Sequence, residues 1–319
     1  MRRLLLGKVK KNLESNRLRV NLAGLELQNP TILASGVMGF TAESLHRVAK
    51  GGAGAVVSKS ISAEPRAGYP NPTVVQAEAG LINAMGLPNP GIDEYAGEIE
   101  YAKTILRVPL IVSVFGYSAE EYAAVAKKAV KAGADAVELN VSCPHVEFTG
   151  AEIGQNPKLL RQVVEKVKAA VSKPLIVKLT PNVADIVVAA RAAVEAGADV
   201  LTAVNTLKAM AIDAETMRPI LSNIKGGLSG AALKPVALRC VYDIREELPD
   251  VPIIGCGGVS DWRDAVEFFL AGASAVQVGT ALAWEDTDVF QSITKGLEVY
   301  LRKKHFGSVK EIVNLAHRS

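Results

Sequence analysis

The sequence predicts an α/β fold: a closed (β/α)8 TIM barrel with long loops over its C-terminal face and a short N-terminal extension. Short apolar runs alternate with helical segments, and eight such units fall between about residues 31 and 300. Runs that are apolar throughout indicate strands buried on both faces of a parallel sheet. A doubly wound sheet would more typically carry a GxGxxG turn near its start, and this sequence contains none.

A recurring glycine–alanine motif marks the junction between helix and strand. Its copies are Gly51–Val57, Ala132–Val137, Ala196–Leu201 and Ala271–Val276. The glycine suits the left-handed position after a helix, and the alanines let helix and strand pack closely. The motif falls on the second, fourth, sixth and eighth predicted strands, as a quasi-symmetric barrel requires.

The remaining predicted strands complete the set of eight. They are Thr31–Ser35, Leu110–Phe115, Leu175–Leu179 and Ile253–Gly255. Helices are expected in the segments between them, at Glu120–Lys131, Lys158–Val171, Ile186–Ala196 and Asp264–Ala271. The longest excursions are Ile61–Tyr95, Val141–Asn156 and Thr206–Lys234, which we interpret as functional loops because structureless segments this long are uncommon in compact domains.

Composition indicates one domain at residues 21–319 behind an extension at residues 1–20. Leu4–Leu6 is too short for a signal peptide, so a short amphipathic surface helix is expected there. A net charge of +3 provides no basic field for nucleic acid, and no apolar window is long enough to span a membrane. The three cysteines are widely spaced, which argues against disulfides and zinc and fits a reducing cytoplasm.

Polar residues gather at the predicted strand ends, where barrel enzymes place their chemistry. They include Ser35, Lys59, Ser60, Ser113, Asn140, Lys178, Asn205 and Thr206. Glycines end the last two strands, at Gly257-Gly258 and at Gly279-Thr280. Backbone amides there could bind a phosphate, although the glycines could also be simple turn residues.

Two lysines end otherwise apolar strands. Burying an isolated ammonium is costly, so Lys59 and Lys178 are either bound to a ligand or paired with carboxylates. A cation beside the N1/O2 edge of a flavin would stabilise its reduced anion. Asn83, Asn140 and Asn205 offer both donors and acceptors, which matches the edge of a pyrimidine ring.

Cys143 is the candidate catalytic residue, since a thiol of lowered pKa could act as a general base toward a carbon acid. Cys240 is better explained as a small buried hydrophobe on a helix. The four histidines show no i, i+4 pair, so a metal site is not favoured. No Ser-His-Asp arrangement is suggested either.

These motifs, taken together and in order, resemble the dihydroorotate dehydrogenase family from about Val20 to Trp284. They are NPTILASGVMGF at 29–40, SKS at 58–60, NAMGLPN at 83–89, ELNVSCP at 138–144, IVKLTPN at 176–182, AVNT at 203–206, GLSGAALKP at 227–235, GCGGV at 255–259 and QVGTA at 277–281. A cysteine in place of a serine base resembles class 1, and the ASGxxGF and GLSGxxxKP forms resemble the catalytic subunit of subclass 1B.

The resemblance implies a flavoprotein oxidoreductase of pyrimidine (UMP) biosynthesis that binds FMN in this one barrel domain. The implied FMN contacts are Ser35, Lys59, Ser60, Ser113, Asn140, Lys178, Val204, Gly230, Gly257, Gly258, Gly279 and Thr280. The implied contacts with dihydroorotate or orotate are Lys59, Asn83, Ala84, Met85, Gly86, Leu87, Asn140, His145, Asn205 and Thr206. Cys143 would remove a proton from C5 while hydride passes from C6 to flavin N5.

The subclass also implies a homodimer that joins an electron-transfer subunit carrying FAD and a [2Fe–2S] cluster, in a heterotetramer linked to NAD+. The chain itself has too few cysteines and no dinucleotide fingerprint for those groups. The physiological acceptor, NAD+ through such a partner or fumarate, is left open.

One position departs from the family pattern. The motif reads SCPH where dihydroorotate dehydrogenases usually read SCPN, so His145 occupies a slot implied to contact substrate. The related domain of dihydropyrimidine dehydrogenase also reads SCPH. A dihydropyrimidine or dihydrouracil oxidoreductase is therefore an alternative function, and a non-redox phosphate-binding barrel subunit is another.

Overall fold

Eight parallel strands form a closed barrel in the computed structural model, which describes residues 17–141 and 150–317. The strands are β3 (Thr31–Leu33), β4 (Ala55–Val57), β7 (Leu110–Val114), β8 (Ala136–Asn140), β9 (Leu175–Leu179), β10 (Val200–Ala203), β15 (Ile253–Cys256) and β16 (Ala275–Val278). They pair in chain order, and β16 pairs with β3 to close the ring. The predicted barrel and all eight predicted strands are confirmed.

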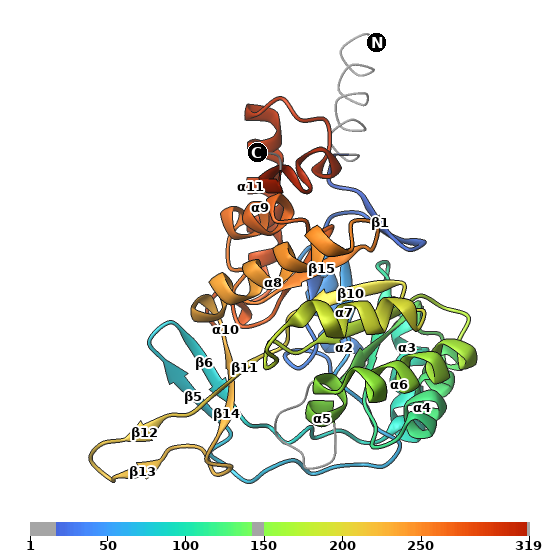
Figure 1. Ribbon diagram of the computed structural model, residues 1–319, viewed down its shortest axis with the longest axis vertical. Helices are drawn as coiled ribbons and strands as arrows, with labels where there is room; N and C mark the ends of the chain where they lie inside the picture. The colour runs from blue at the N-terminus through green and yellow to red at the C-terminus, as the bar shows by residue number, and fades with distance from the viewer. Residues whose placement is uncertain (1–16, 142–149, 318–319) are drawn as a thin grey trace.

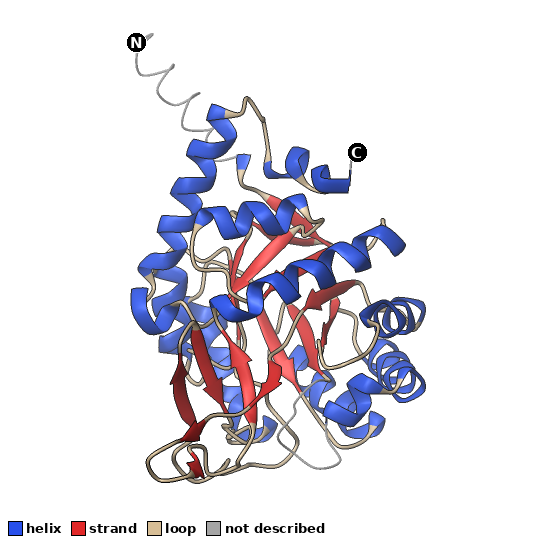
Figure 2. Cartoon of the chain, turned by 60° about the vertical axis from the view of Figure 1, so that its left-hand side comes forward, coloured by secondary structure: helices blue, strands red, loops and turns tan. Residues whose placement is uncertain are grey.

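Helices surround this barrel on its outer side (Figures 1 and 2). They are α2 (Ala42–Lys50), α3 (Ile92–Ile105), α4 (Ala119–Lys131), α6 (Pro157–Ala170), α7 (Ile186–Glu195), α8 (Lys234–Glu247), α9 (Trp262–Leu270) and α11 (Asp288–Lys303). Side-chain caps such as Asp185 and Asp261 start them, and Gly133 and Gly197 follow them with φ of 115° and 102°. The four predicted helices are confirmed to within two residues at each end.

A hairpin covers the N-terminal ends of the barrel strands, the end that we call the bottom of the barrel; the top is the C-terminal end. Strands β1 (Val20–Leu22) and β2 (Leu25–Leu27) pair across a turn at Ala23-Gly24, where both residues have positive φ. Its buried leucines pack against inward-facing residues of the barrel strands. β1 begins at Val20, one residue before the predicted start of the barrel domain.

The barrel interior divides into two layers, because alternate residues of a strand share a face. The lower layer is apolar, packs on the hairpin and consists of Ile32, Val57, Ile111, Ala136, Ile176, Val200, Ile254 and Ala275. The upper layer lies two residues further along each strand and consists of Ala34, Lys59, Ser113, Glu138, Lys178, Thr202, Cys256 and Gln277. Two residues further along each strand, the sealed apolar lower layer is therefore followed by a largely polar upper layer.

A second sheet forms at the top of the barrel from segments that the sequence presented as loops. Its strands are β5 (Val74–Ala77), β6 (Gly80–Asn83), β11 (Leu207–Ala209) and β14 (Gly226–Ser229), in the order β11-β14-β6-β5. They come from the two excursions Ile61–Tyr95 and Thr206–Lys234, and Figure 1 shows them on one side of the barrel. Interpreting these excursions as loops alone was wrong; their strands are only three or four residues long, and β6 and β14 contain glycines, so the sequence pattern of a strand is weak there.

Smaller elements complete the chain. The hairpin β12 (Ile212–Asp213) and β13 (Arg218–Pro219) extends beyond the second sheet (Figure 1). The remaining helices are α5 (Gly150–Gln155), η1 (Ala231–Leu233), α10 (Leu282–Glu285), η2 (Val309–Ile312) and η3 (Leu315–His317). Of the helices that the structure describes, none combines the length and the apolar character needed to cross a bilayer. The helix expected at the N-terminus lies outside the described residues.

Candidate active site

A cavity of about 870 Å³ opens between the upper layer of the barrel and the second sheet, at the C-terminal ends of the strands. This volume is within the range of small-molecule and cofactor sites. Its walls bring together most of the predicted site residues: Ser35, Lys59, Ser60, Asn83, Met85, Gly86, Leu87, Asn140, Lys178, Val204, Asn205, Thr206, Gly230, Gly257, Gly258, Gly279 and Thr280.

Of the described predicted site residues, two do not line this cavity. Ser113 is fully buried behind Ser60, and Ala84 packs with Ile82 beneath the second sheet. Cys143 and His145 lie outside the described residues. Ser113 contacts Ser60, which lines the cavity, and its predicted role stays a prediction.

A chain of hydrogen bonds crosses the cavity wall and sets the orientation of the asparagines. Ser60 Oγ lies 3.3 Å from Ser35 Oγ and 2.9 Å from Ser113 Oγ. Asn140 Nδ2 donates to Ser60 Oγ at 3.0 Å, and Asn205 Nδ2 donates to Asn140 Oδ1 at 3.1 Å. Because each amide donates to a defined oxygen, this network determines which atoms of Asn140 and Asn205 face each neighbour.

Lys59 lies two residues after the end of β4 and is almost fully buried. Its backbone N–H donates to Gly39 O at 3.0 Å, which ties the strand end to the loop after β3. Its Nζ lies 5.6 Å from the ring centroid of Phe40, within the range of a cation–π contact. The lysine thus presents its positive charge at the wall of the cavity.

Lys178 reaches the cavity floor and is held by two residues that sequence reasoning missed. Its Nζ donates to Gln277 Oε1 at 2.8 Å and lies 3.9 Å from Glu138 Oε1. Gln277 Nε2 in turn donates to Glu138 Oε2 at 2.6 Å, and Thr202 Oγ1 donates to the same oxygen at 3.0 Å. The sequence left open whether Lys178 binds a ligand or pairs with a carboxylate. In the structure it pairs with the carboxylate of Glu138.

The charges of this cluster are set by one another as well as by burial. Burial disfavours the Lys178 ammonium, yet its pKa lies above the usual lysine value because its interactions with Cys256 and Glu138 outweigh burial. Burial raises the pKa of the Cys256 thiol; the Lys178 ammonium opposes that rise, and the Glu138 carboxylate adds to it.

A glycine cradle lies at the ends of β14, β15 and β16, where Gly257 directly follows Cys256. Gly230, Gly257 and Gly258 have φ of 93°, 134° and 79°, a region that side-chain-bearing residues rarely adopt. A Cβ at Gly258 would lie 2.8 Å from Gly230 O. Closely packed glycine backbone of this kind leaves amides exposed toward an anion such as a phosphate.

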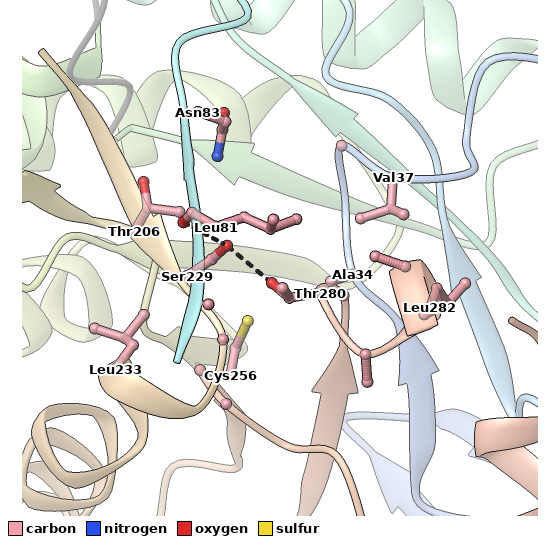
Figure 3. Close-up of a pocket in the computed structure, with 18 of the residues that line it drawn as sticks. Ala34, Val37, Leu81, Asn83, Thr206, Ser229, Leu233, Cys256, Thr280 and Leu282 are labelled. Atoms are coloured by element: carbon pink, nitrogen blue, oxygen red, sulfur yellow. Dashed lines mark hydrogen bonds between the residues drawn. The ribbon is translucent and has the colours of Figure 1, made fainter. Parts of the chain in front are cut away.

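The second sheet is joined to this cradle by side chains (Figure 3). Thr280 Oγ1 donates to Ser229 Oγ at 2.8 Å, which links the end of β14 to the turn after β16. Figure 3 also shows the Cys256 sulfur directed into the space between the cradle and the sheet. The cavity therefore has a polar floor, a glycine-rich end and a wall supplied by the second sheet.

Within the described ranges, no group of three His, Cys, Asp or Glu side chains could hold a metal ion.

Glu138 and Gln277 carry a sequence signal that could have revealed them. Each is a polar residue within an apolar strand, two positions away from the lower layer on the same face. A buried carboxylate requires a partner, and Lys178 lies one strand away.

The fold and the cavity define a (β/α)8 barrel with a ligand site at the C-terminal ends of its strands. Two lysines, several asparagines and a glycine cradle line this site. The chain belongs to the dihydroorotate dehydrogenase family, whose model matches residues 17–301. It is therefore an oxidoreductase, as the sequence motifs predicted.

Similar proteins support the subclass. A protein of Methanosarcina acetivorans is 52% identical over 93% of this chain and 95% of its own length. One of Pyrococcus furiosus is 53% identical over 94% of this chain and 99% of its own length. Both are named "Dihydroorotate dehydrogenase B (NAD(+)), catalytic subunit". The predicted likeness to subclass 1B is thus confirmed.

A solved structure supports the fold. The crystal structure of DHODH in complex with ferulenol from Eimeria tenella superposes with a TM-score of 0.83 at 25% identity, over 95% of this chain and 89% of that chain.

Proposed function

We propose that this chain is the FMN-binding catalytic subunit of a dihydroorotate dehydrogenase that oxidises dihydroorotate to orotate for pyrimidine synthesis. The observation that carries the proposal is the pairing, in one cavity, of a glycine cradle with a lysine-bearing polar floor. The family and the names of the relatives support the reaction.

The residues present fit FMN. The cradle at Gly257-Gly258, with Gly279-Thr280 beside it, would hold the phosphate. Lys178 would face the pyrimidine edge of the ring system, where a cation favours the reduced anion. When bound, FMN would supply the two-electron acceptor for a hydride from C6 of the substrate.

The substrate would bind against the asparagines. Asn140 and Asn205 are fixed by their hydrogen bonds, and Asn83 lies on β6 with Nδ2 directed to Gly227 O at 3.4 Å. Their amides would complement the alternating N–H and C=O groups of the ring. Lys59 would pair with the carboxylate of dihydroorotate.

Cys143 is proposed as the base that takes the proton from C5, and His145 as a substrate contact. Both lie outside the described residues, so their support is the SCPH motif alone. A cysteine is a far better proton acceptor near neutral pH than the serine of other classes, because its pKa is about 8.5.

Electrons would leave through a partner subunit carrying FAD and a [2Fe–2S] cluster, on the way to NAD+. Such a cluster usually takes four cysteine ligands, and this chain has three cysteines in total. We further propose a homodimer of this chain within a heterotetramer, in the cytoplasm. The relatives' designation as a catalytic subunit supports the partner.

The test is to purify the chain, extract its cofactor and measure turnover with an artificial acceptor. We expect a yellow protein with about one FMN per chain and preferential oxidation of dihydroorotate. A protein that stays colourless after FMN is added contradicts the proposal. Preference for dihydrouracil would instead favour the dihydropyrimidine oxidoreductase alternative that His145 raises.

A further inference from the structure

The cluster beneath the cavity contains a carboxylate that no proposed step uses. Glu138 is 0% exposed, and it is the acidic member of the upper layer, which otherwise holds the titratable groups Lys59, Lys178 and Cys256. An unpaired buried carboxylate is destabilising, so Glu138 requires a partner that offsets the cost of its burial.

The hydrogen bonds divide the two oxygens of Glu138 between different tasks. Oε2 accepts from Gln277 Nε2 and from Thr202 Oγ1. Oε1 accepts no hydrogen bond from any described residue and faces Lys178 Nζ at 3.9 Å. One oxygen therefore anchors the carboxylate, and the other directs its charge at the lysine.

Gln277 transmits this anchoring to the lysine. Its amide donates to Glu138 and accepts from Lys178, and the acidic partner leaves only one orientation of the amide that satisfies both contacts. The ammonium is thereby held from behind by Gln277 and Glu138, and Lys178 lines the cavity.

We propose that Glu138 is a positioning residue that fixes both the charge and the place of Lys178, through the ion pair and the Gln277 bridge. The consequence for the flavin rests on the proposed function: the carboxylate lowers the net positive charge beneath the ring and so sets the reduction potential. Glu138 does not line the cavity, so it would act on a ligand through Lys178 and Gln277.

Cys256 is a built-in reporter of this charge balance. Its thiol interacts with Lys178, lines the cavity and is partly exposed. When the Glu138 charge is removed, either member of the Lys178–Cys256 pair loses a proton more easily, and the thiolate forms at lower pH. Thiol alkylation followed peptide by peptide measures this in flavin-stripped, full-length protein.

Glu138→Gln is the decisive variant because it keeps the shape and the anchor. Its oxygen can still accept from Gln277 and Thr202, and its amide replaces the oxygen that accepts no hydrogen bond. We expect the midpoint pH of Cys256 alkylation to fall by at least about one unit, a tenfold faster reaction at pH 7. The matched control Thr202→Val removes one bond to the same carboxylate but no charge, and should leave the midpoint unchanged.

Lys178→Met provides a second arm that does not depend on Glu138→Gln folding. With the ammonium removed and the carboxylate kept, the Cys256 midpoint should rise above that of the unaltered protein. The proposal is overturned if the midpoint pH of Cys256 alkylation in Glu138→Gln equals that of the unaltered protein, or if the midpoint in Lys178→Met does not rise above it.

The flavin arm separates this inference from the proposed function. In FMN-loaded Glu138→Gln at pH 6, we expect the equilibrium constant for two-electron reduction to favour the reduced form by at least about tenfold, or about 30 mV. A shifted alkylation midpoint with an unchanged potential overturns the action on the flavin. If the unaltered chain binds no FMN, the proposed function fails, while the alkylation arm still decides the role of Glu138.

Discussion

The lower and upper layers of the barrel interior are built from the same eight strands and differ by two residues along each. Below, Ile254 and its neighbours are buried, apolar and sealed by the β1–β2 hairpin. Above, Glu138, Lys178 and Gln277 are equally buried but form a network of charge and hydrogen bonds. Burial alone therefore does not distinguish stabilising positions from chemical ones; the presence of an open cavity on one side does.

The largest expected effect lies above the upper layer, at the proposed base. Cys143→Ser should slow reduction of bound FMN by dihydroorotate about 10³-fold or more near pH 7, about 4 kcal/mol in barrier, because serine is a much weaker base. Stopped-flow absorbance of the flavin measures it. FMN content and thermal stability serve as controls and should not change. An unaltered rate would place the base elsewhere.

The next effect should come from the lower layer and appear only in stability. Ile254→Ala removes a fully buried side chain two residues before Cys256 and should lower the free energy of unfolding by about 2–5 kcal/mol. Urea titration measures this. FMN affinity, compared after both proteins are shown to be folded, should change less than about threefold. A large loss of FMN binding would show that the two layers are not independent.

Glycines with positive φ allow a matched test of the two ends of the barrel. Gly258→Ala, in the cradle, should weaken FMN binding about 100-fold, about 2.7 kcal/mol, because its Cβ would lie 2.8 Å from Gly230 O and displace the amides. Gly24→Ala, in the sealing hairpin, has φ of 91° and nothing within 4 Å of its Cβ. The control should lose about 1 kcal/mol of stability and no affinity. Fluorescence titration distinguishes them, and equal losses of affinity would contradict the cradle.

The smallest effect concerns the outer face of the barrel, where Cys240 is a buried residue of α8. Burial raises the pKa of this thiol to about 11, whereas an unfolded thiol titrates near about 8.5. Between these values the folded chain keeps a proton that the unfolded chain has lost, so the free energy of unfolding falls as pH rises.

The loss from Cys240 should be on the order of 2 kcal/mol between pH 8.5 and 10.5. It is measured as the difference in pH dependence between the unaltered chain and Cys240→Ala, since other groups also titrate in this range. Identical slopes would show that the thiol does not remain protonated in the folded state.

The barrel could be predicted from sequence because its signals are local. Each glycine–alanine copy marks a helix end and a strand start within seven residues, and the structure confirms all four. Strand ends then indicated the polar residues that meet at the cavity. The same reasoning described Lys178 as needing a ligand or a carboxylate, but could not choose between them.

The parts that could not be predicted depend on contacts between distant segments. The bond that joins Gln277 to Glu138 spans 139 residues, and no local pattern specifies such a partner. The second sheet escaped detection for a similar reason: strands such as β6 are short, and their pairing lies far along the chain. Local sequence determines where a strand ends, whereas the closed barrel determines what it meets.

The second sheet has a consequence for the order in which the molecule assembles and comes apart. Its central pair joins β6 to β14, and Asn83 and Gly227 are separated by 144 positions. Their loop-closure entropy is offset only once the intervening barrel strands have brought the two excursions together. We therefore expect the cavity wall to form last and to open first, so that amide exchange in β6 and β14 is faster than in β8 or β9.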